Sequence, residues 1–158
     1  MRFALIILLG SVLSAAAQTR EWQAQLLPAE KKVYTDSVTG HTNTALSTRP
    51  SREQIGPCRH NAVLCDGSMI VFTSDRDGLT AYYGCLTEGG ELVKFLPDAV
   101  SNAYGAVVSR YRPLLYLLRK RSLFSWQITP TRTEQSTVVN FQEKKLGEIP
   151  EGYSLLEP

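Results

Sequence analysis

This sequence of 158 residues contains few histidines and few cysteines, and neither basic nor acidic side chains are in large excess. There are two histidines and three cysteines, and 17 basic side chains stand against 15 acidic ones. A net charge this close to zero gives no electrostatic basis for binding nucleic acid or another strongly charged partner. The sequence also lacks a G-x-S-x-G elbow, a G-x-x-x-x-G-K-[ST] phosphate loop and an H-E-x-x-H helix, so the enzyme classes defined by those motifs receive no support.

Long apolar runs are confined to the N-terminus. Arg2 precedes an apolar stretch at 3–13, and three alanines follow at 15–17, an arrangement typical of a secretory signal peptide. The stretch is too short to cross ~30 Å of hydrocarbon as a helix, and no later segment approaches the ~20 apolar residues of a membrane-spanning helix. We therefore expect a signal peptide at 1–17, an exported protein (periplasmic or secreted), and one domain at 18–158.

Three cysteines are an odd number for an oxidising compartment. Cys58, Cys65 and Cys85 allow one disulfide and one free thiol, and the sequence does not select the pair. A zinc site at Cys58, His60 and Cys65 is the alternative, but it lacks the close C-x2-4-C pair of structural zinc sites. We therefore favour buried or incidental thiols.

The stretch from 68 to 95 predicts three short antiparallel strands. SMIVFTS at 68–74 is rich in β-branched and aromatic residues, and DRDG separates it from a second strand, LTAYYGCL, at 79–86. TEGG separates that strand from a third, ELVKF, at 91–95. Together they predict a meander.

The same order of strands recurs downstream. The second copy consists of PLLYLLR at 113–119, SLFSWQI at 122–128, the polar turn TPTRTEQ at 129–135, and STVVNF at 136–141. An inner fourth strand is predicted for each copy, in NAVLCDG at 61–67 and in GAVVS at 105–109. A period of roughly 40 to 50 residues with four strands in each unit is typical of β-propeller blades.

We therefore predict an all-β fold, a partial β-propeller with two clear blades at about 61–96 and 105–141 and incomplete units on either side. KKVYTDSVTGHTNTALST at 31–48 predicts two strands around SVTG, and the tail at 145–158 begins a further segment. Closed propellers have roughly four to eight blades, and an open array leaves apolar faces and strand edges exposed. Either the chain is the front part of a longer propeller or it pairs with something else, and we favour truncation.

Particular residues resemble a known family. IVFTSDRDG at 70–78, followed by an aromatic strand and TEGGEL, resembles the blade repeat of TolB-like propellers. The order VYTDSVTGHTNTALST, LCDGSMIVFTSDRDG, AYYGCLTEGGELVKF, VVSRYRPLLYLLRKRSLFSWQI and STVVNF is similar to the opening blades of the seven-bladed oligogalacturonate lyase family, polysaccharide lyase family 22, from about Lys32 to about Tyr153. The chain departs from the family at Cys65, where such blades usually carry Pro, and in SREQIGPCRHNA at 51–62.

The resemblance implies β-elimination of pectin-derived oligogalacturonates, helped by a divalent metal such as manganese. Removal of the proton on C5 requires a group that neutralises the uronate carboxylate and a base. In the family the metal is held by several histidines and a glutamine from later blades, which His41 and His60 cannot replace. We therefore assign no catalytic residue, metal ligand or substrate-binding residue to this chain.

Two functions remain open at this stage. The first is the N-terminal portion of an oligogalacturonide lyase-like protein, inactive by itself because the catalytic half is absent. The alternative is a non-catalytic, TolB-like propeller module that binds a protein or a glycan in the cell envelope. Both predict the same β-meander, and they differ in what lies beyond Pro158.

Two charged groups have a functional and a structural interpretation. Asp75 and Asp77 resemble part of a calcium loop, but the D-x-D-x-D-G series is absent, and aspartate commonly accepts hydrogen bonds in turns. Five basic residues could bind an anionic sugar or a phosphate, although exposed charges at a hairpin tip are ordinary. This basic group is Arg110, Arg112, Arg119, Lys120 and Arg121.

The remaining candidates also favour structural roles. Trp22 and Trp126 could stack on sugar rings, but Trp126 lies at strand spacing and is predicted to pack between blades. Glu88 and Glu91 could form a glycosidase pair, but they flank the exposed turn EGGE. His41 is predicted to be a solvated side chain.

Overall fold

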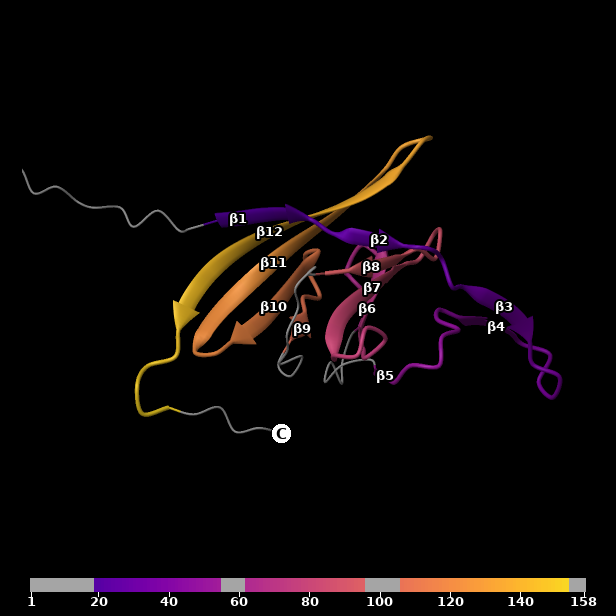
Figure 1. Ribbon diagram of the computed structural model, residues 1–158, viewed down its shortest axis with the longest axis horizontal. Coiled ribbons are helices and arrows are strands. Elements are labelled where there is room, and N and C mark those ends of the chain that lie inside the picture. Colours follow the sequence, from indigo (N-terminus) through magenta and orange to yellow (C-terminus); the bar gives the residue numbers. More distant parts are fainter. Residues whose placement is uncertain (1–18, 55–61, 96–105, 154–158) are drawn as a thin grey trace, which may run out of the picture.

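The structure, a computed structural model, describes residues 19–54, 62–95 and 106–153, and within these ranges it contains strands and no helix (Figure 1). Two five-stranded antiparallel sheets have the orders β1-β12-β11-β10-β9 and β2-β8-β7-β6-β5, and β3 pairs with β4. The predicted all-β class is confirmed. The strands are β1 (Thr19–Gln23), β2 (Gln25–Leu27), β3 (Lys32–Thr35), β4 (Thr42–Ala45), β5 (Glu53–Gln54), β6 (Met69–Ser74), β7 (Ala81–Leu86), β8 (Leu92–Lys94), β9 (Val107–Val108), β10 (Leu114–Arg119), β11 (Ser122–Arg132) and β12 (Thr137–Glu148).

We call the sheet that contains β12 sheet A and the sheet that contains β8 sheet B. Neither sheet closes into a ring or barrel. No helix in the described ranges is long and apolar enough to cross a membrane. The predicted signal peptide at 1–17, Cys58 and His60 lie outside the described residues.

The first predicted meander is confirmed as β6, β7 and β8 of sheet B. The register places Val71 opposite Gly84 and Gly84 opposite Val93. The turn DRDG closes with a hydrogen bond from the Gly78 amide to the Asp75 carbonyl (2.8 Å), and Gly78 has a φ of 86°. Glycine is favoured there because residues with a Cβ rarely adopt this left-handed conformation.

The inner strand predicted at 61–67 is wrong in its extent. Within the described residues 62–67, Val63 alone forms a bridge, to Ile70, and the chain then turns at Cys65 and Asp66. The edge of β6 is shared with β5, whose Glu53 lies opposite Ser74. The turn at Cys65 and Asp66 ends the pairing with β6 after Leu64, whose amide donates to the carbonyl of Met69 (2.9 Å).

The second meander is confirmed as β10, β11 and β12 of sheet A, with β9 at the inner edge. The predicted turn at 129–135 is too long, because β11 continues to Arg132 and the chain reverses only at 133–136. β10 begins at Leu114, opposite Gln127, so the part of β11 that follows Gln127 pairs with β12 alone. Pro130 is tolerated there because its missing amide hydrogen would face no third strand. The β11–β12 hairpin consequently extends beyond the rest of its sheet.

Lys120 in the two-residue turn between β10 and β11 has a φ of 55°. This conformation costs a residue with a Cβ about 1 kcal/mol. We therefore expect Lys120→Gly to raise the free energy of unfolding by about 0.5 kcal/mol, after allowance for the greater freedom of glycine in the unfolded chain. Urea denaturation followed by circular dichroism measures the change. Lys120→Ala keeps the Cβ and should bring no gain; an equal gain in both variants would mean that backbone strain is not the cause.

An N-terminal segment links the two sheets, which the sequence did not predict. β1 adds to the outer edge of β12, and β2, which begins after Ala24, adds to the outer edge of β8. Ala24 is buried, and its amide donates to the carbonyl of Val139 (2.9 Å). In Figure 1 this indigo segment passes from β12 of sheet A to β8 of sheet B. It gives each four-stranded unit a fifth strand.

The main core lies between the two sheets. Sheet A contributes Trp126, Ile128 and Phe141, and sheet B contributes Met69 and Val71 among others. A Cβ at Gly84 would lie 2.2 Å from the Met69 Sδ and 3.0 Å from the Phe95 Cε1. The sheets therefore meet closely at this point, and any side chain at position 84 would displace core atoms.

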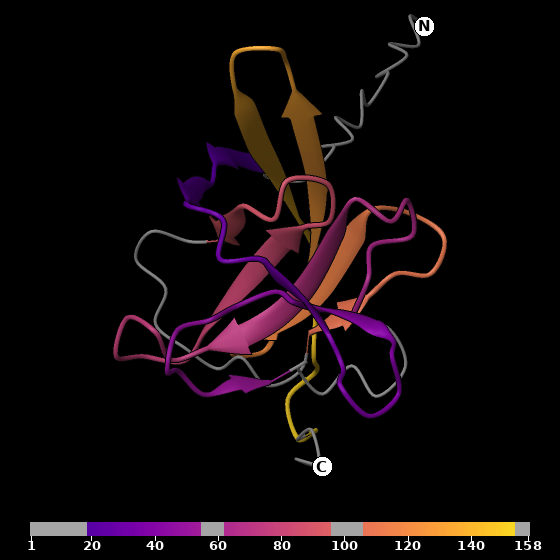
Figure 2. The ribbon, with the colours of Figure 1, turned by 90° about the vertical axis from the view of Figure 1, so that its right-hand side faces the viewer.

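The two sheets differ in how much of their surface is covered. The other face of sheet B packs a second apolar cluster of Phe72, Ala81, Tyr83, Cys85 and Leu92, against which Leu27 and Leu46 lie. Figure 2 looks onto this side, where the N-terminal segment that holds β3 and β4 crosses in front of the sheet B strands. Sheet B is thus buried on both faces.

The outer face of sheet A is only partly covered. Leu118 lies opposite Leu123, and Tyr116 lies opposite Val107, so the four side chains share one face. Leu123 is 40% exposed and Val107 is 58% exposed, and the other two are half-buried. This face carries apolar side chains near β9 and β10 and polar ones near β1 and β12.

Candidate functional site

The structure separates the basic group into two parts. Arg110 and Arg112 precede β10 and are exposed, whereas Arg119 to Arg121 lie at its far end. A strand of this length is about 20 Å long, so the two parts do not form one patch. Arg119 contacts the carboxylate of Glu143, and Arg121 donates to the carbonyl of Ile149 (2.8 Å). The structural interpretation of this group is therefore favoured.

Asp75 and Asp77 are bound by protein donors. The Asp75 Oδ1 accepts from the amide of Arg52 (2.8 Å), and the Asp77 Oδ2 accepts from the Tyr83 hydroxyl (2.8 Å) and the Lys94 ammonium (2.6 Å). The hydrogen bonds from Lys94 and then Tyr83 lower the pKa of Asp77, and burial raises the pKa of Tyr83. Both carboxylates hold the β6–β7 turn against neighbouring segments, as the structural interpretation predicted.

Arg76, between these two aspartates, has a role that the sequence did not reveal. Its side chain is fully buried and forms ion pairs with Glu30 (3.1 Å) and Glu53. It also donates to the hydroxyls of Ser47 and Ser74, each at 3.1 Å. Arg76 therefore joins the turn of sheet B to the segments on either side of the β3–β4 hairpin.

Both tryptophans belong to one aromatic cluster. Trp22 stacks on Phe141 at 5.2 Å between ring centroids and meets Trp126 edge-on at 5.2 Å. The Trp22 Nε1 donates to the carbonyl of Phe95 (2.7 Å), and the Trp126 Nε1 donates to Glu143 (2.7 Å). The predicted packing role of Trp126 is confirmed, and Trp22 shares it.

The other predicted candidates also have structural partners. Glu88 and Glu91 both pair with Arg132, at 3.2 and 2.6 Å, so this carboxylate pair ties the β7–β8 turn to β11 of the other sheet. Cys65 is exposed and Cys85 is buried, and both are free thiols, which excludes a disulfide between them. Burial raises the pKa of the Cys85 thiol.

His41 is exposed in the turn between β3 and β4, as predicted. Within the described part of the chain, no group of three or more His, Cys, Asp or Glu side chains could hold a metal ion. The described residues therefore do not fit the metal centre that the family resemblance implied, and no chemical step is assigned through a metal.

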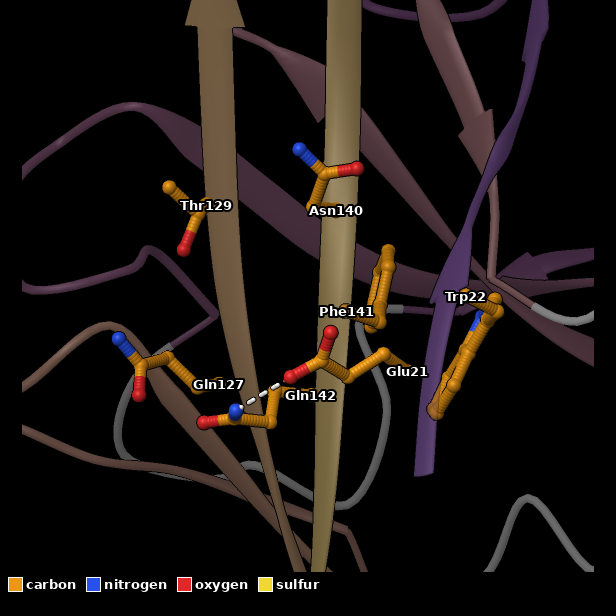
Figure 3. A pocket seen from close by; sticks show the side chains of 7 residues that line it. All are labelled: Glu21, Trp22, Gln127, Thr129, Asn140, Phe141 and Gln142. Carbon is orange, nitrogen blue, oxygen red and sulfur yellow. Dashed lines mark hydrogen bonds between the residues drawn. The ribbon is translucent and has the colours of Figure 1, made fainter. Parts of the chain in front are cut away.

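One hollow lies on the outer face of sheet A, over β1, β11 and β12 (Figure 3). It encloses about 490 Å³ and is lined by Glu21, Trp22, Gln127, Thr129, Asn140, Phe141 and Gln142. The Gln142 side chain donates to the Glu21 carboxylate (2.7 Å). No motif in the sequence marks this hollow, because alternating polar residues on a strand are also typical of a solvated face. The polar alternation common to β1, β11 and β12 was the only available signal.

Comparison with known proteins finds solved structures with a similar fold. No protein-family model matches the sequence, and no curated protein does so either. The structure is similar to that of an oligogalacturonate lyase in complex with manganese, with a TM-score of 0.56 and 20% identity over 66% of this chain. An oligogalacturonate lyase from Vibrio parahaemolyticus gives a TM-score of 0.55 and 18% identity over 67% of this chain. The chain spans 28% of the length of each of these proteins.

Proposed function

We propose that this chain is the opening portion of an oligogalacturonate lyase-like propeller. The observation that carries the proposal is the strand arrangement it shares with two such lyases over two thirds of its length. The two successive antiparallel units, β5–β8 and β9–β12, are consistent with adjacent blades. Export through a signal peptide at 1–17 is part of the proposal and rests on the sequence.

The incompletely covered face of sheet A supports this proposal. In a propeller each blade packs its two faces against its two neighbours, and among the described residues sheet A has such a neighbour on one face only. The exposed Val107 and Leu123 lie where a further blade would pack. The complete protein would act on oligogalacturonates by β-elimination, with residues beyond those described providing the metal site.

The proposal predicts no lyase activity for this chain by itself. The purified protein is incubated with oligogalacturonides and manganese, and the ultraviolet absorbance of an unsaturated uronate product is followed. We expect no increase above the protein-free control, because no described cluster can hold the metal. An authentic oligogalacturonate lyase serves as the positive control. A robust signal from this chain would show that the catalytic groups are present.

The genomic sequence beyond codon 158 distinguishes the proposal from the alternative. Further four-stranded units with a histidine cluster, in the same or a shifted frame, would support the lyase. An early stop in many independent isolates would instead favour the non-catalytic, TolB-like module that binds a protein or a glycan.

A further inference from the structure

The β3–β4 hairpin has a strand edge to which no described residue bonds, the edge of β3 that faces away from β4. β3 pairs with β4 alone, and the two strands form a sheet of their own. Every residue of β3 is exposed, and Val33 and Tyr34 are 56% and 50% exposed. In Figure 1 the hairpin lies at the end of the molecule, beyond sheet B. Because a two-stranded hairpin by itself is only marginally stable in water, a further strand on this edge would stabilise it.

The hydrogen bonds of the hairpin show which amides face the free edge of β3. The Asp36 amide donates to the carbonyl of the opposed His41 (2.8 Å), so these residues form a hydrogen-bonded pair. Hydrogen-bonded and non-hydrogen-bonded pairs alternate along an antiparallel ladder. The backbone of Tyr34 therefore bonds to β4, whereas the backbone groups of Val33 and Thr35 point to the free edge. A strand added there must place its own outward-facing residues opposite these two.

β3 meets this requirement when it pairs with a second β3. In an antiparallel arrangement about a twofold axis at Tyr34, Val33 lies opposite Thr35 of the second copy, and the two Tyr34 side chains face each other. Lys32 then lies opposite Asp36 of the second copy, so opposite charges meet on both sides of the axis. Axes at the neighbouring residues also satisfy the backbone, but they place Lys32 opposite an uncharged residue.

Both charged side chains are available for this contact. No described residue forms an ion pair or a hydrogen bond with the exposed Lys32 side chain. The Asp36 Oδ1 accepts from the amides of Val38 (2.9 Å) and Thr39 (2.7 Å), and its Oδ2 accepts from no described residue. Hydrogen bonds from Thr39 and then Val38 lower the pKa of Asp36, so its carboxylate is charged at neutral pH.

We propose that the free edge of β3 is a docking site for a second copy of this chain. The two hairpins join into one antiparallel sheet with the strand order β4-β3-β3-β4, and the Lys32–Asp36 pairs select the register. The contact involves neither sheet A nor sheet B, so it does not depend on the proposed lyase function. The ladder is short, so the dimer is weak, and its charge pairs make it weaker as the salt concentration rises.

Sedimentation velocity from about 1 μM to about 1 mM protein tests the proposal, since a small interface gives a dissociation constant in this range. We expect the unmodified chain to pass from monomer to dimer, and Thr35→Pro to stay monomeric. Proline at position 35 removes an amide that faces the free edge and leaves the bonds to β4 in place. Thr44→Pro is the matched control, because the Thr44 amide faces the opposite edge of the same hairpin.

The register is tested by the charges. Lys32→Glu turns both charge pairs from attraction to repulsion and should raise the dissociation constant of the dimer by about tenfold or more. Lys144→Glu makes the same change of net charge at an exposed position on β12 and should leave the dimer unchanged. Equal dissociation constants in these two variants would contradict the proposed register.

Amide hydrogen exchange in the unmodified chain removes the dependence on variants that fold poorly. At dimer-forming concentrations, the amides of Val33 and Thr35 should become protected, whereas the Tyr34 amide, which already bonds to β4, should change little. A chain that stays monomeric at the highest concentration would overturn the proposal. A dimer that leaves the Val33 and Thr35 amides unprotected, or that Thr35→Pro and Thr44→Pro form equally well, would also overturn it, because the contact would then lie on another surface.

Discussion

Trp126→Ala is expected to destabilise the protein by about 4 kcal/mol, near the upper end for loss of a core aromatic side chain. Trp126 is 1% exposed and contacts the rings of Trp22, Phe95 and Phe141 at centroid distances of 5.2, 6.3 and 5.9 Å. These rings come from both sheets and from the N-terminal segment, so the cavity would open where all three meet.

Loss of a hydrogen bond adds to the effect of the cavity. The Trp126 Nε1 donates to the carboxylate of Glu143, a residue that is 7% exposed and that also contacts Arg119. A buried carboxylate that loses one donor costs about 1–3 kcal/mol. Trp126→Phe keeps an aromatic ring in the core, so it removes the donor but only part of the volume.

Urea denaturation followed by circular dichroism measures these changes. We expect Trp126→Phe to lose about half as much stability as Trp126→Ala. Since domains of this size are stable by about 5–15 kcal/mol, the alanine variant would keep as little as about 1 kcal/mol of stability. A loss below about 1 kcal/mol in Trp126→Ala would contradict the packing between the sheets.

The position of Trp126 illustrates what the sequence could predict. Its strand spacing in SLFSWQI indicated a packed side chain, and the meander strands around it followed from β-branched residues and turn signals, which act locally. Its partners were not predictable in this way. Glu143 and Trp22 reach it from other strands, and the bond between Glu21 and Gln142 joins residues 121 positions apart.

The candidate sites show the same limit. The carboxylate pairs looked like ligand groups in the sequence because their cationic partners, Lys94 and Arg132, belong to other strands. Conversely, the residues of the hollow carry no motif, since they become neighbours only when β1 pairs with β12. The strand at 19–23 has few apolar residues, so its partner at the sheet edge could not be inferred from pattern.

Arg76→Met is expected to destabilise the protein by about 2–3 kcal/mol. Breaking a fully buried ion pair costs about 3–5 kcal/mol, because the remaining charge is left without compensation. The partners Glu30 and Glu53 keep 16% and 27% of their side-chain exposure, so water relieves part of that cost. Methionine fills a similar volume, which limits the contribution of a cavity.

Arg49→Met is the matched control, because Arg49 pairs with the same carboxylate. Its guanidinium lies 3.5 Å from Glu30, but its side chain is 60% exposed. An exposed pair contributes about 0.5 kcal/mol or less. Comparable losses in the two variants would contradict the assignment of Arg76 as the buried link between the β3–β4 segments and sheet B.

The effect of Arg76→Met should also depend on pH. Burial raises the pKa of Glu30, but hydrogen bonds from Ser47 and Thr48 and the charge of Arg76 together lower it below its ordinary value of 4.5. A lowered pKa contributes stability that is present above the unfolded-state pKa and is lost as the pH falls through the folded-state pKa. We therefore expect the difference between wild type and Arg76→Met, measured by urea denaturation, to be constant from pH 7 to about pH 5 and to shrink below pH 4.5. A difference that stays constant down to pH 3 would mean that packing, and not the charge of Arg76, accounts for the loss.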